Sequence, residues 1–208
     1  MIFAVIPAAG MSRRMGEPKL LLPLGDDTVI GHVLSSLRAL ATEHQLVVAR
    51  PDDDELSSVL VHYGVRLVRP DSAPPDMRSS VECALRSITE DFQPTDEDSW
   101  MLVPADSVTL KRHVVDKLIQ VWRTTSEDIL IPVHGERRGH PAFFKWRLAE
   151  QLFQIDPTRG VNALRQMPDV TTRFYPVDDA CVLADLDTPE EYTALTNELS
   201  KQTRESKQ

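Results

Sequence analysis

Residues 2–19 read IFAVIPAAGMSRRMGEPK, and the way this stretch divides decides the fold. The apolar run IFAVI predicts a buried first strand, because a short apolar run bounded by turn residues is typical of a central strand. The segment behind it, residues 10–19, combines two glycines, a serine, two arginines and a lysine. A turn requires only one or two such residues. The remainder of the segment therefore calls for a functional explanation.

Short β-rich runs alternate with longer helical patterns along most of the chain. The expected strands are 2–6, 45–50, 65–70, 100–106, 128–133 and 141–146, and the expected helices are 29–40, 54–63, 80–88 and 113–122. This alternation predicts βαβ units, with a mostly parallel sheet and helices on both faces. The connection at 134–140 is too short for a crossover and suits an antiparallel hairpin. We therefore expect a mixed sheet in a Rossmann-like three-layer α/β/α domain.

Length and composition limit the organisation of the chain. Its 208 residues fit a single domain, which we place at residues 1–195, followed by a polar C-terminal tail at 196–208. The segments 71–76 and 89–99 are rich in turn-forming or acidic residues and are expected to be surface loops.

Charge and cysteine content exclude several classes of protein. A net charge of −9 argues against a nucleic-acid partner, because a phosphate-neutralising surface normally makes a domain basic. Cys83 and Cys181 are the only cysteines, too few for a disulfide framework. No apolar run approaches the roughly 20 residues that span a bilayer, and the N-terminus lacks the features of a signal peptide. We expect a cytoplasmic protein without a membrane partner.

The glycine-containing segment lies where open α/β sheets bind ligands, at the carboxyl end of a parallel strand. Gly10 has no Cβ, so neighbouring amides can approach a phosphate, and Arg14 and Lys19 add mobile cations. Two familiar phosphate loops do not fit. GxGxxG is absent, and the Walker A pattern fails because Glu17 and Pro18 separate the second glycine from the lysine. A Rossmann dehydrogenase and a P-loop kinase are therefore both poorly supported.

The segment resembles the opening signature of the MobA-like NTP transferases, the nucleotidyltransferases that activate sugars, isoprenoid precursors and molybdenum cofactor. That signature is Ala-Ala-Gly-any-Ser-any-Arg-Met-Gly-any-any-Lys, and residues 8–19 match it. The resemblance implies a fold of the nucleotide-diphospho-sugar transferase type and a loop that wraps the triphosphate of an incoming NTP. The residues implied in nucleotide binding are Ala8, Ala9, Gly10, Met11, Ser12, Arg14 and Lys19. Arg14 and Lys19 are also implied in catalysis. A cationic turn that merely caps the next helix is the alternative.

Acidic residues at two places supply candidate metal ligands. Asp106 follows the expected strand WMLVPA, where the family has an aspartate, although the family's following proline is missing here. DLDTPEEY contributes Asp185 and Asp187, and it resembles the segment that provides the other metal ligand in molybdenum cofactor cytidylyltransferases. Mg²⁺ is usually held by one or two carboxylates together with phosphate oxygens, so we expect Mg²⁺, with Mn²⁺ as an alternative. Which of Asp185 and Asp187 binds metal stays open. Taken alone, DTPEE is better explained by helix capping, and beside the opening signature and Asp106 both roles can hold together.

Two further segments match the resemblance. MRSSVECAL, at 77–85, is similar to the family's base-binding segment, which implies that Ser80 binds nucleotide and that Arg78 reaches a phosphate. A plain serine cap of the following helix is the alternative. GERRGHPAFF, at 135–144, resembles the Gly-any-any-Gly-His-Pro stretch of the molybdenum cofactor cytidylyltransferases. It implies an acceptor-binding set, which consists of Arg137, Arg138, Gly139 and His140. Here the alternative is a hairpin turn with a solvated pair of arginines.

Together the resemblance implies a nucleotidyltransferase that transfers CMP from CTP to molybdopterin. CTP is favoured because Ala9 stands where the guanylyl-transferring branch has glycine. A molybdenum hydroxylase enzyme is a candidate receiver of the product. Three alternatives remain: transfer to a sugar phosphate or another small phosphorylated acceptor, a non-catalytic molybdenum cofactor chaperone, and a redox enzyme. The missing proline after Asp106 supports the chaperone, whereas no nicotinamide or flavin site is recognisable for the redox enzyme.

Overall fold

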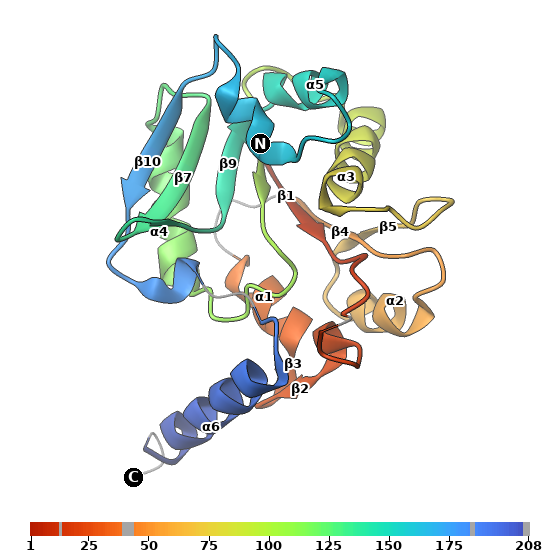
Figure 1. Ribbon diagram of the computed structural model, residues 1–208, viewed down its shortest axis with the longest axis vertical. Helices are drawn as coiled ribbons and strands as arrows, with labels where there is room; N and C mark the ends of the chain where they lie inside the picture. Colours follow the sequence, from red (N-terminus) through yellow and green to blue (C-terminus); the bar gives the residue numbers. More distant parts are fainter. Residues whose placement is uncertain (13, 39–43, 184–185, 206–208) are drawn as a thin grey trace.

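A computed structural model describes residues 1–12, 14–38, 44–183 and 186–205. Within this part of the chain the central element is an eight-stranded sheet in the order β10-β7-β9-β6-β1-β4-β5, with β8 paired to β7 (Figure 1). Its strands are β1 (Ile2–Pro7), β4 (His44–Val48), β5 (Arg66–Val68), β6 (Ser99–Leu102), β7 (Ile129–His134), β8 (Arg137–Arg138), β9 (Ala142–Lys145) and β10 (Thr172–Pro176). A small separate sheet pairs β2 (Pro23–Leu24) with β3 (Asp27–Thr28).

The strand directions confirm a mostly parallel but mixed sheet. β1 runs parallel to both of its neighbours, β4 and β6, and β4 runs parallel to β5. β9 is the exception, because it lies antiparallel between β6 and β7. The short connection between β7 and β9 is thus the antiparallel hairpin that the sequence predicts. Because β7 is parallel to β6, the carboxyl ends of β1, β4, β6 and β7 all lie along one edge of the sheet.

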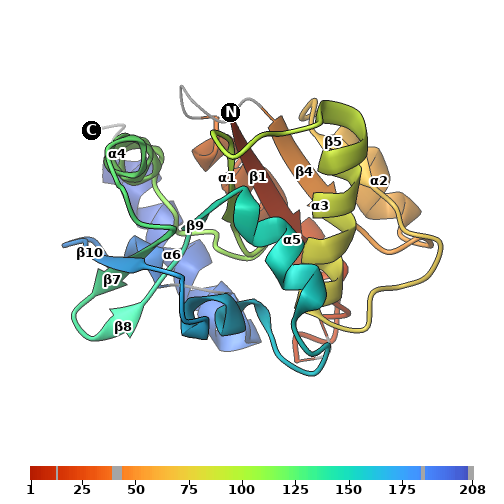
Figure 2. The ribbon, with the colours of Figure 1, turned by 90° about the horizontal axis from the view of Figure 1, so that it is seen from above.

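Helices cover both faces of the sheet, which confirms the three-layer arrangement. They are α1 (Val29–Ser36), α2 (Asp54–Val61), α3 (Met77–Phe92), α4 (Arg112–Arg123), α5 (Arg147–Gln154) and α6 (Pro189–Glu205), with short 3₁₀ turns η1 (Lys19–Leu21), η2 (Val161–Gln166) and η3 (Ala180–Val182). Ile2, Ala4 and Ile6 of β1 pack with α1, α2 and α4, whereas Phe3 and Val5 pack with α3 and α5. Figure 2 shows α3 beside α5 on one side of the sheet. The alternation along β1 therefore separates two cores.

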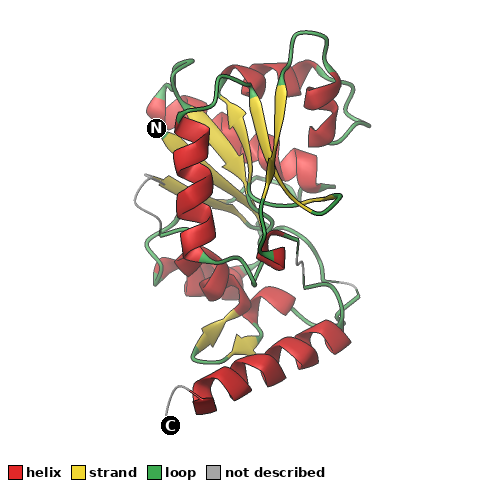
Figure 3. Ribbon diagram, turned by 90° about the vertical axis from the view of Figure 1, so that its left-hand side faces the viewer, coloured by secondary structure: helices red, strands yellow, loops and turns green. Residues whose placement is uncertain are grey.

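The structure differs from the sequence prediction at several elements, of which α5 and β10 were not predicted. The helix expected at 80–88 begins at Met77, because the Asp76 carboxylate caps it by accepting from the Ser79 amide at 2.7 Å. This helix also continues to Phe92, so the predicted loop at 89–99 starts later than expected. α6 crosses the boundary drawn at 195, and it projects from the body beside β2 and β3 (Figures 1 and 3). The domain boundary itself stays a prediction.

Within the described residues, no helix combines the length and the apolarity that a transmembrane span requires.

A buried carboxylate ties together three strands at the edge opposite the carboxyl ends. Asp128 precedes β7, is about 8% exposed, and accepts hydrogen bonds from the amide and hydroxyl of Thr171 before β10. It also pairs with Arg147 at 2.8 Å and with Lys145, at the end of β9, at 3.4 Å. Burial alone raises the pKa of Asp128, but the hydrogen bonds from Thr171 and Arg147 outweigh burial and lower the pKa from 3.8 to about 2.

Asp128→Asn tests this cluster through the pH dependence of folding. The folded-state pKa lies below the unfolded value, so the charge contributes stability above about pH 4 and loses it as the pH falls toward 2. We expect the variant to lose about 2 kcal/mol of unfolding free energy at pH 7. The gap between wild type and variant should close between about pH 4 and pH 2 in urea titrations. The exposed control Asp96→Asn should show no such gap, and a gap independent of pH would contradict the assignment.

Candidate functional site

A cavity of about 680 Å³ opens at the carboxyl edge of the sheet, and we call it the main cavity. Its walls come from the loop after β1, the end of β6 and the segment before α3. The residues predicted from sequence that line it are Ala8, Ala9, Gly10, Met11, Ser12, Arg14, Lys19, Ser80, Asp106 and Asp187. The structure thus brings the predicted nucleotide and metal residues together in one place. Asp185 lies outside the described residues.

The loop after β1 has a defined backbone path. The amides of Met15 and Gly16 donate to the carbonyl of Ser12 at 3.0 and 3.2 Å, with Gly16 at a φ of +74° and Ser12 at +47°. A Cβ added to Gly10 would meet no protein atom within 4 Å, so packing alone does not explain that glycine. One expectation needs correction: the Ala8 amide donates to the Val48 carbonyl at 2.8 Å and is not available to a phosphate.

An ion cluster joins this loop to two distant parts of the chain. The Lys19 ammonium contacts Asp106 Oδ2 at 2.5 Å, the Leu186 carbonyl at 2.7 Å and Asp187 Oδ1 at 3.3 Å. Arg14 Nη1 donates to the other oxygen of Asp187 at 2.9 Å. The Lys19 and Asp106 side chains are only 15% and 18% exposed. Two predicted cations and two predicted acids therefore form one group of zero formal charge, in which Lys19 and Asp106 are largely buried and Arg14 is exposed.

Asp106 and Asp187 form a suitable pair of ligands for a divalent cation. The Lys19 ammonium already bridges both carboxylates, so a cation fits between them. The described residues contain no group of three or more His, Cys, Asp or Glu side chains placed to hold a metal. Such a two-carboxylate set matches the way in which Mg²⁺ is held, with phosphate oxygens and water completing its shell. The described residues thus offer only part of a coordination sphere.

Another wall of the main cavity combines the end of the expected loop 71–76 with the start of the expected base-binding segment 77–85. Residues 73–77 line the cavity together with Ser80, whose side chain is buried. The Ser80 hydroxyl donates to the Asp76 carbonyl at 3.2 Å, within the first turn of α3. Met11 and Met77 are 64% and 51% exposed, and both line the cavity. This wall is therefore largely apolar, which suits the face of a planar ring.

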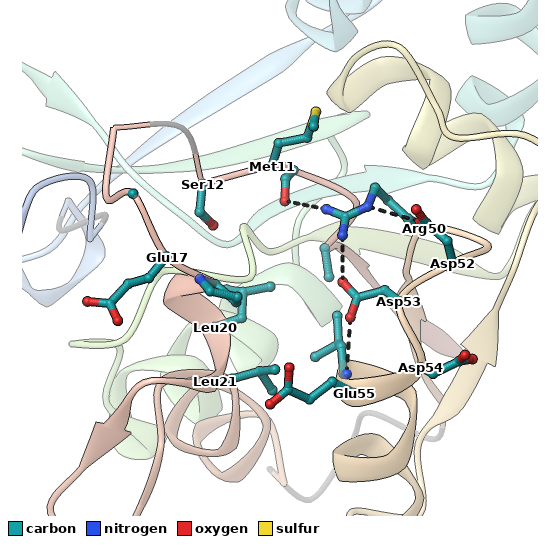
Figure 4. A pocket seen from close by; sticks show the side chains of 15 residues that line it. Met11, Ser12, Glu17, Leu20, Leu21, Arg50, Asp52, Asp53, Asp54 and Glu55 are labelled. Carbon is teal, nitrogen blue, oxygen red and sulfur yellow. Dashed lines mark hydrogen bonds and ion pairs between the residues drawn. The ribbon is translucent and has the colours of Figure 1, made fainter.

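Arg50 is a residue of the site that the sequence analysis missed. It follows β4 and lines both the main cavity and a second cavity of about 480 Å³ (Figure 4). Its guanidinium contacts the Gly10 carbonyl at 3.5 Å, Asp52 at 3.2 Å and Asp53 at 3.4 Å. Asp53 caps α2 by accepting from the Leu56 amide. Arg50 therefore ties the glycine loop to α2. Its position just after a strand that neighbours β1 is the sequence feature that could have identified it as a residue of the site.

Arg78 does not reach a phosphate, and this expectation is wrong. Its side chain is 5% exposed and pairs with Glu82 at 2.8 Å. The guanidinium also donates to four main-chain carbonyls, which belong to Leu152, Ile155, Asp156 and Arg159. These carbonyls lie at and beyond the end of α5, where helical carbonyls lack partners. Arg78 thus fixes the segment that follows α5 and serves the fold.

The predicted acceptor residues lie along the same edge of the sheet but outside the main cavity. Arg137 and Arg138 are exposed in β8, and the Arg138 guanidinium lies 5.5 Å from the centre of the Phe174 ring. The His140 amide donates to the Val182 carbonyl at 2.8 Å, and a Cβ on Gly139 would lie 2.3 Å from that oxygen. Gly139 and His140 therefore hold η3, which precedes the segment with Asp187. Direct contact of these four residues with an acceptor stays a prediction.

Comparisons with known proteins identify a family and several relatives of this chain. The model of the family described as MobA-like NTP transferase domain matches residues 4–172. The molybdenum cofactor cytidylyltransferase of Escherichia coli is 20% identical over 191 residues, which cover 92% of this chain and 93% of that protein. A 2-C-methyl-D-erythritol 4-phosphate cytidylyltransferase of Shewanella piezotolerans is 32% identical over 133 residues, covering 62% of this chain and about half (54%) of that relative. Rv0371C of Mycobacterium tuberculosis, solved as a complex with manganese, has a TM-score of 0.73 at 22% identity, and the match covers 94% of this chain and 98% of that one.

Gly139→Ala tests the close contact that holds η3. The new methyl group would press on the Val182 carbonyl, so we expect a loss of about 1–3 kcal/mol of unfolding free energy in urea titrations. Hydrogen exchange should also become faster at 180–183. Gly160→Ala is the matched control, because a Cβ there meets nothing within 4 Å and the backbone is extended, so its stability should change by less than about 0.5 kcal/mol. Equal stability of the two variants would refute the contact.

Proposed function

This chain belongs to the family of MobA-like NTP transferase domains, and from this premise we propose that it transfers CMP from CTP to molybdopterin and releases pyrophosphate. Membership of the family makes it a nucleotidyltransferase, whereas the choice of nucleotide and acceptor is our proposal. The observation that carries the proposal is the cluster of Lys19, Asp106 and Asp187 on the wall of the main cavity. This cluster combines cations for a triphosphate with carboxylates for a divalent cation.

The residues of the site support catalysis by positioning and charge stabilisation. The acceptor phosphate is an anionic nucleophile that attacks the α-phosphorus, so the reaction requires no general base. The amides of residues 9–12 and the cations Arg14 and Lys19 orient the triphosphate and stabilise its charge. Asp106 and Asp187 would hold a divalent cation, Mg²⁺ in our proposal, and this cation would neutralise further negative charge of the phosphates. Mn²⁺ is the alternative metal.

The choice of acceptor rests on likeness along the whole chain. The E. coli relative, a molybdenum cofactor cytidylyltransferase by name, matches this chain and is matched by it almost from end to end. The Shewanella relative has a higher identity, but the match covers only about half of that protein's length. Ala9 and the Gly139–His140 dipeptide also support CTP and molybdopterin. A cytoplasmic protein that delivers its product to a molybdenum hydroxylase enzyme completes the proposal, with sugar phosphates and other small phosphorylated acceptors as the alternatives.

A non-catalytic chaperone is less well supported than an enzyme. Its sequence support was the missing proline after Asp106, a change that would displace the carboxylate. In the structure Asp106 nevertheless lines the main cavity and contacts Lys19. The Leu186 amide also donates to the Asp106 carbonyl at 3.2 Å, which fixes this turn without the proline.

A panel of nucleotides tests the choice of CTP. A ligand that binds only the native state stabilises it by about 2.7 kcal/mol at a hundred times its Kd, which corresponds to roughly 5–10 °C in Tm for a protein of this size. With Mg²⁺ present, CTP should raise Tm by several degrees more than ATP, GTP or UTP. Release of pyrophosphate with CTP should then require molybdopterin. Equal shifts with all four nucleotides would refute the base assignment, and release only with a sugar phosphate would refute the acceptor.

Asp106→Asn separates an enzyme from a chaperone. The change removes one of the two carboxylates, so pyrophosphate release should fall by at least about a thousandfold. Folding should change by less than about 1 kcal/mol, because the ion pair is partly exposed and Asp187 still faces Lys19. Asp116→Asn on α4 is the control of equal charge change and should retain turnover. Negligible turnover in wild type and variant alike, with pterin binding retained, would support the chaperone.

A further inference from the structure

We propose that the Lys19 ammonium is a stand-in cation, which occupies the place of the metal ion between Asp106 and Asp187 until a nucleotide binds. The divalent cation then binds tightly only together with the nucleotide. This inference rests on the proposed function, because it concerns the same carboxylates and the same triphosphate. It adds an obligatory coupling between the two ligands, with Lys19 as the switching residue. Three features of the described residues carry it: the contacts of the ammonium, the charge balance of the cluster and the small number of carboxylates.

The Lys19 ammonium has no donor left for a phosphate in this structure. An ammonium carries three N–H groups, and three protein oxygens lie within hydrogen-bonding distance of Nζ. They are Asp106 Oδ2 at 2.5 Å, the Leu186 carbonyl at 2.7 Å and Asp187 Oδ1 at 3.3 Å. A triphosphate can therefore reach Lys19 only if the side chain releases at least one of these partners. The longest contact, to Asp187, is the first one that we expect to break.

The charges of the cluster explain why a metal ion alone binds weakly. Arg14 and Lys19 balance Asp106 and Asp187, and Asp187 contacts both cations. A dication arriving alone would have to displace the ammonium and would then face two uncompensated positive side chains. It would also find only two carboxylates among the described residues, so without a nucleotide water alone would have to complete its coordination shell. Both effects oppose metal binding before the nucleotide.

A nucleotide triphosphate removes both obstacles at once. Its oxygens provide new acceptors for Lys19 and Arg14, which leave the carboxylates, and they supply the ligands that complete the metal shell. Each ligand thus prepares the site for the other, and by thermodynamic linkage each must raise the affinity of the other. The site exchanges its internal cation for an external one.

Binding of Mn²⁺ in the absence of nucleotide tests the stand-in role. The loss of the free Mn²⁺ signal in electron paramagnetic resonance reports binding to wild type, Lys19→Met and Lys19→Gln. Without the ammonium both variants should bind Mn²⁺ at least about tenfold more tightly than wild type, because a competing unit charge at contact distance is gone. The same variants should bind CTP at least about tenfold more weakly, since a phosphate contact is lost. A single substitution thus shifts the two affinities in opposite directions.

Matched variants locate the effect. Lys19→Arg keeps the charge and should bind Mn²⁺ as weakly as wild type. Lys145→Met removes a lysine that pairs with Asp128 away from the main cavity and should leave Mn²⁺ binding unchanged. Adding Asp106→Asn to Lys19→Met should abolish the gained affinity. The inference is overturned if neither neutral variant binds Mn²⁺ more tightly than wild type, or if the gain survives Asp106→Asn. Because this titration contains no nucleotide, failure of CTP to bind would count against the proposed function alone.

Discussion

The contact of the Lys19 ammonium with Asp106 and Asp187 is the interaction on which the arrangement of the site depends. It joins residues that are 87 and 168 positions apart in the chain. Through it the loop after β1, the turn after β6 and the segment before α6 converge on one wall of the main cavity. The pairs are only partly buried, so solvent screening limits their contribution to stability. Their importance lies in holding three separate loops in register with one another.

The sheet makes this convergence possible. β6 lies directly beside β1 and parallel to it, so the loop with Lys19 and the turn with Asp106 leave the sheet at the same edge. The antiparallel strand β9 starts at that edge, and the residues just before it hold η3 through the Val182 carbonyl. One antiparallel strand in a parallel sheet thus places Gly139 and His140 where they support the third loop. The strand order therefore brings the three loops of the ion cluster to the same edge of the sheet.

Much of the fold and the centre of the site could be predicted from the sequence, because both depend on local patterns. The apolar run of β1 predicts a buried strand, and the match of the following residues to the family's signature implies the loop and the acids that the structure brings together. Arg50 and Arg78 show the limit of this approach. The two arginines follow or begin ordinary elements, yet one ties the glycine loop to α2 and the other binds carbonyls beyond α5. Only the tertiary packing decides which arginine faces the cavity.

The same limit explains why the role expected for Gly139 from the sequence differs from the contact that the structure shows. Its sequence context suggested contact with an acceptor, whereas the structure shows a backbone approach that leaves no room for a Cβ unless the Val182 carbonyl shifts. A role in positioning does not exclude a role in binding, but it changes the expected effect of mutation from lost contact to a displaced loop. The cations of the site are likewise engaged within the protein, because Arg14, Lys19 and Arg50 are all paired with carboxylates. Under the proposed function, such a site would attract simple anions weakly and would select a ligand that brings both many phosphate oxygens and a divalent cation.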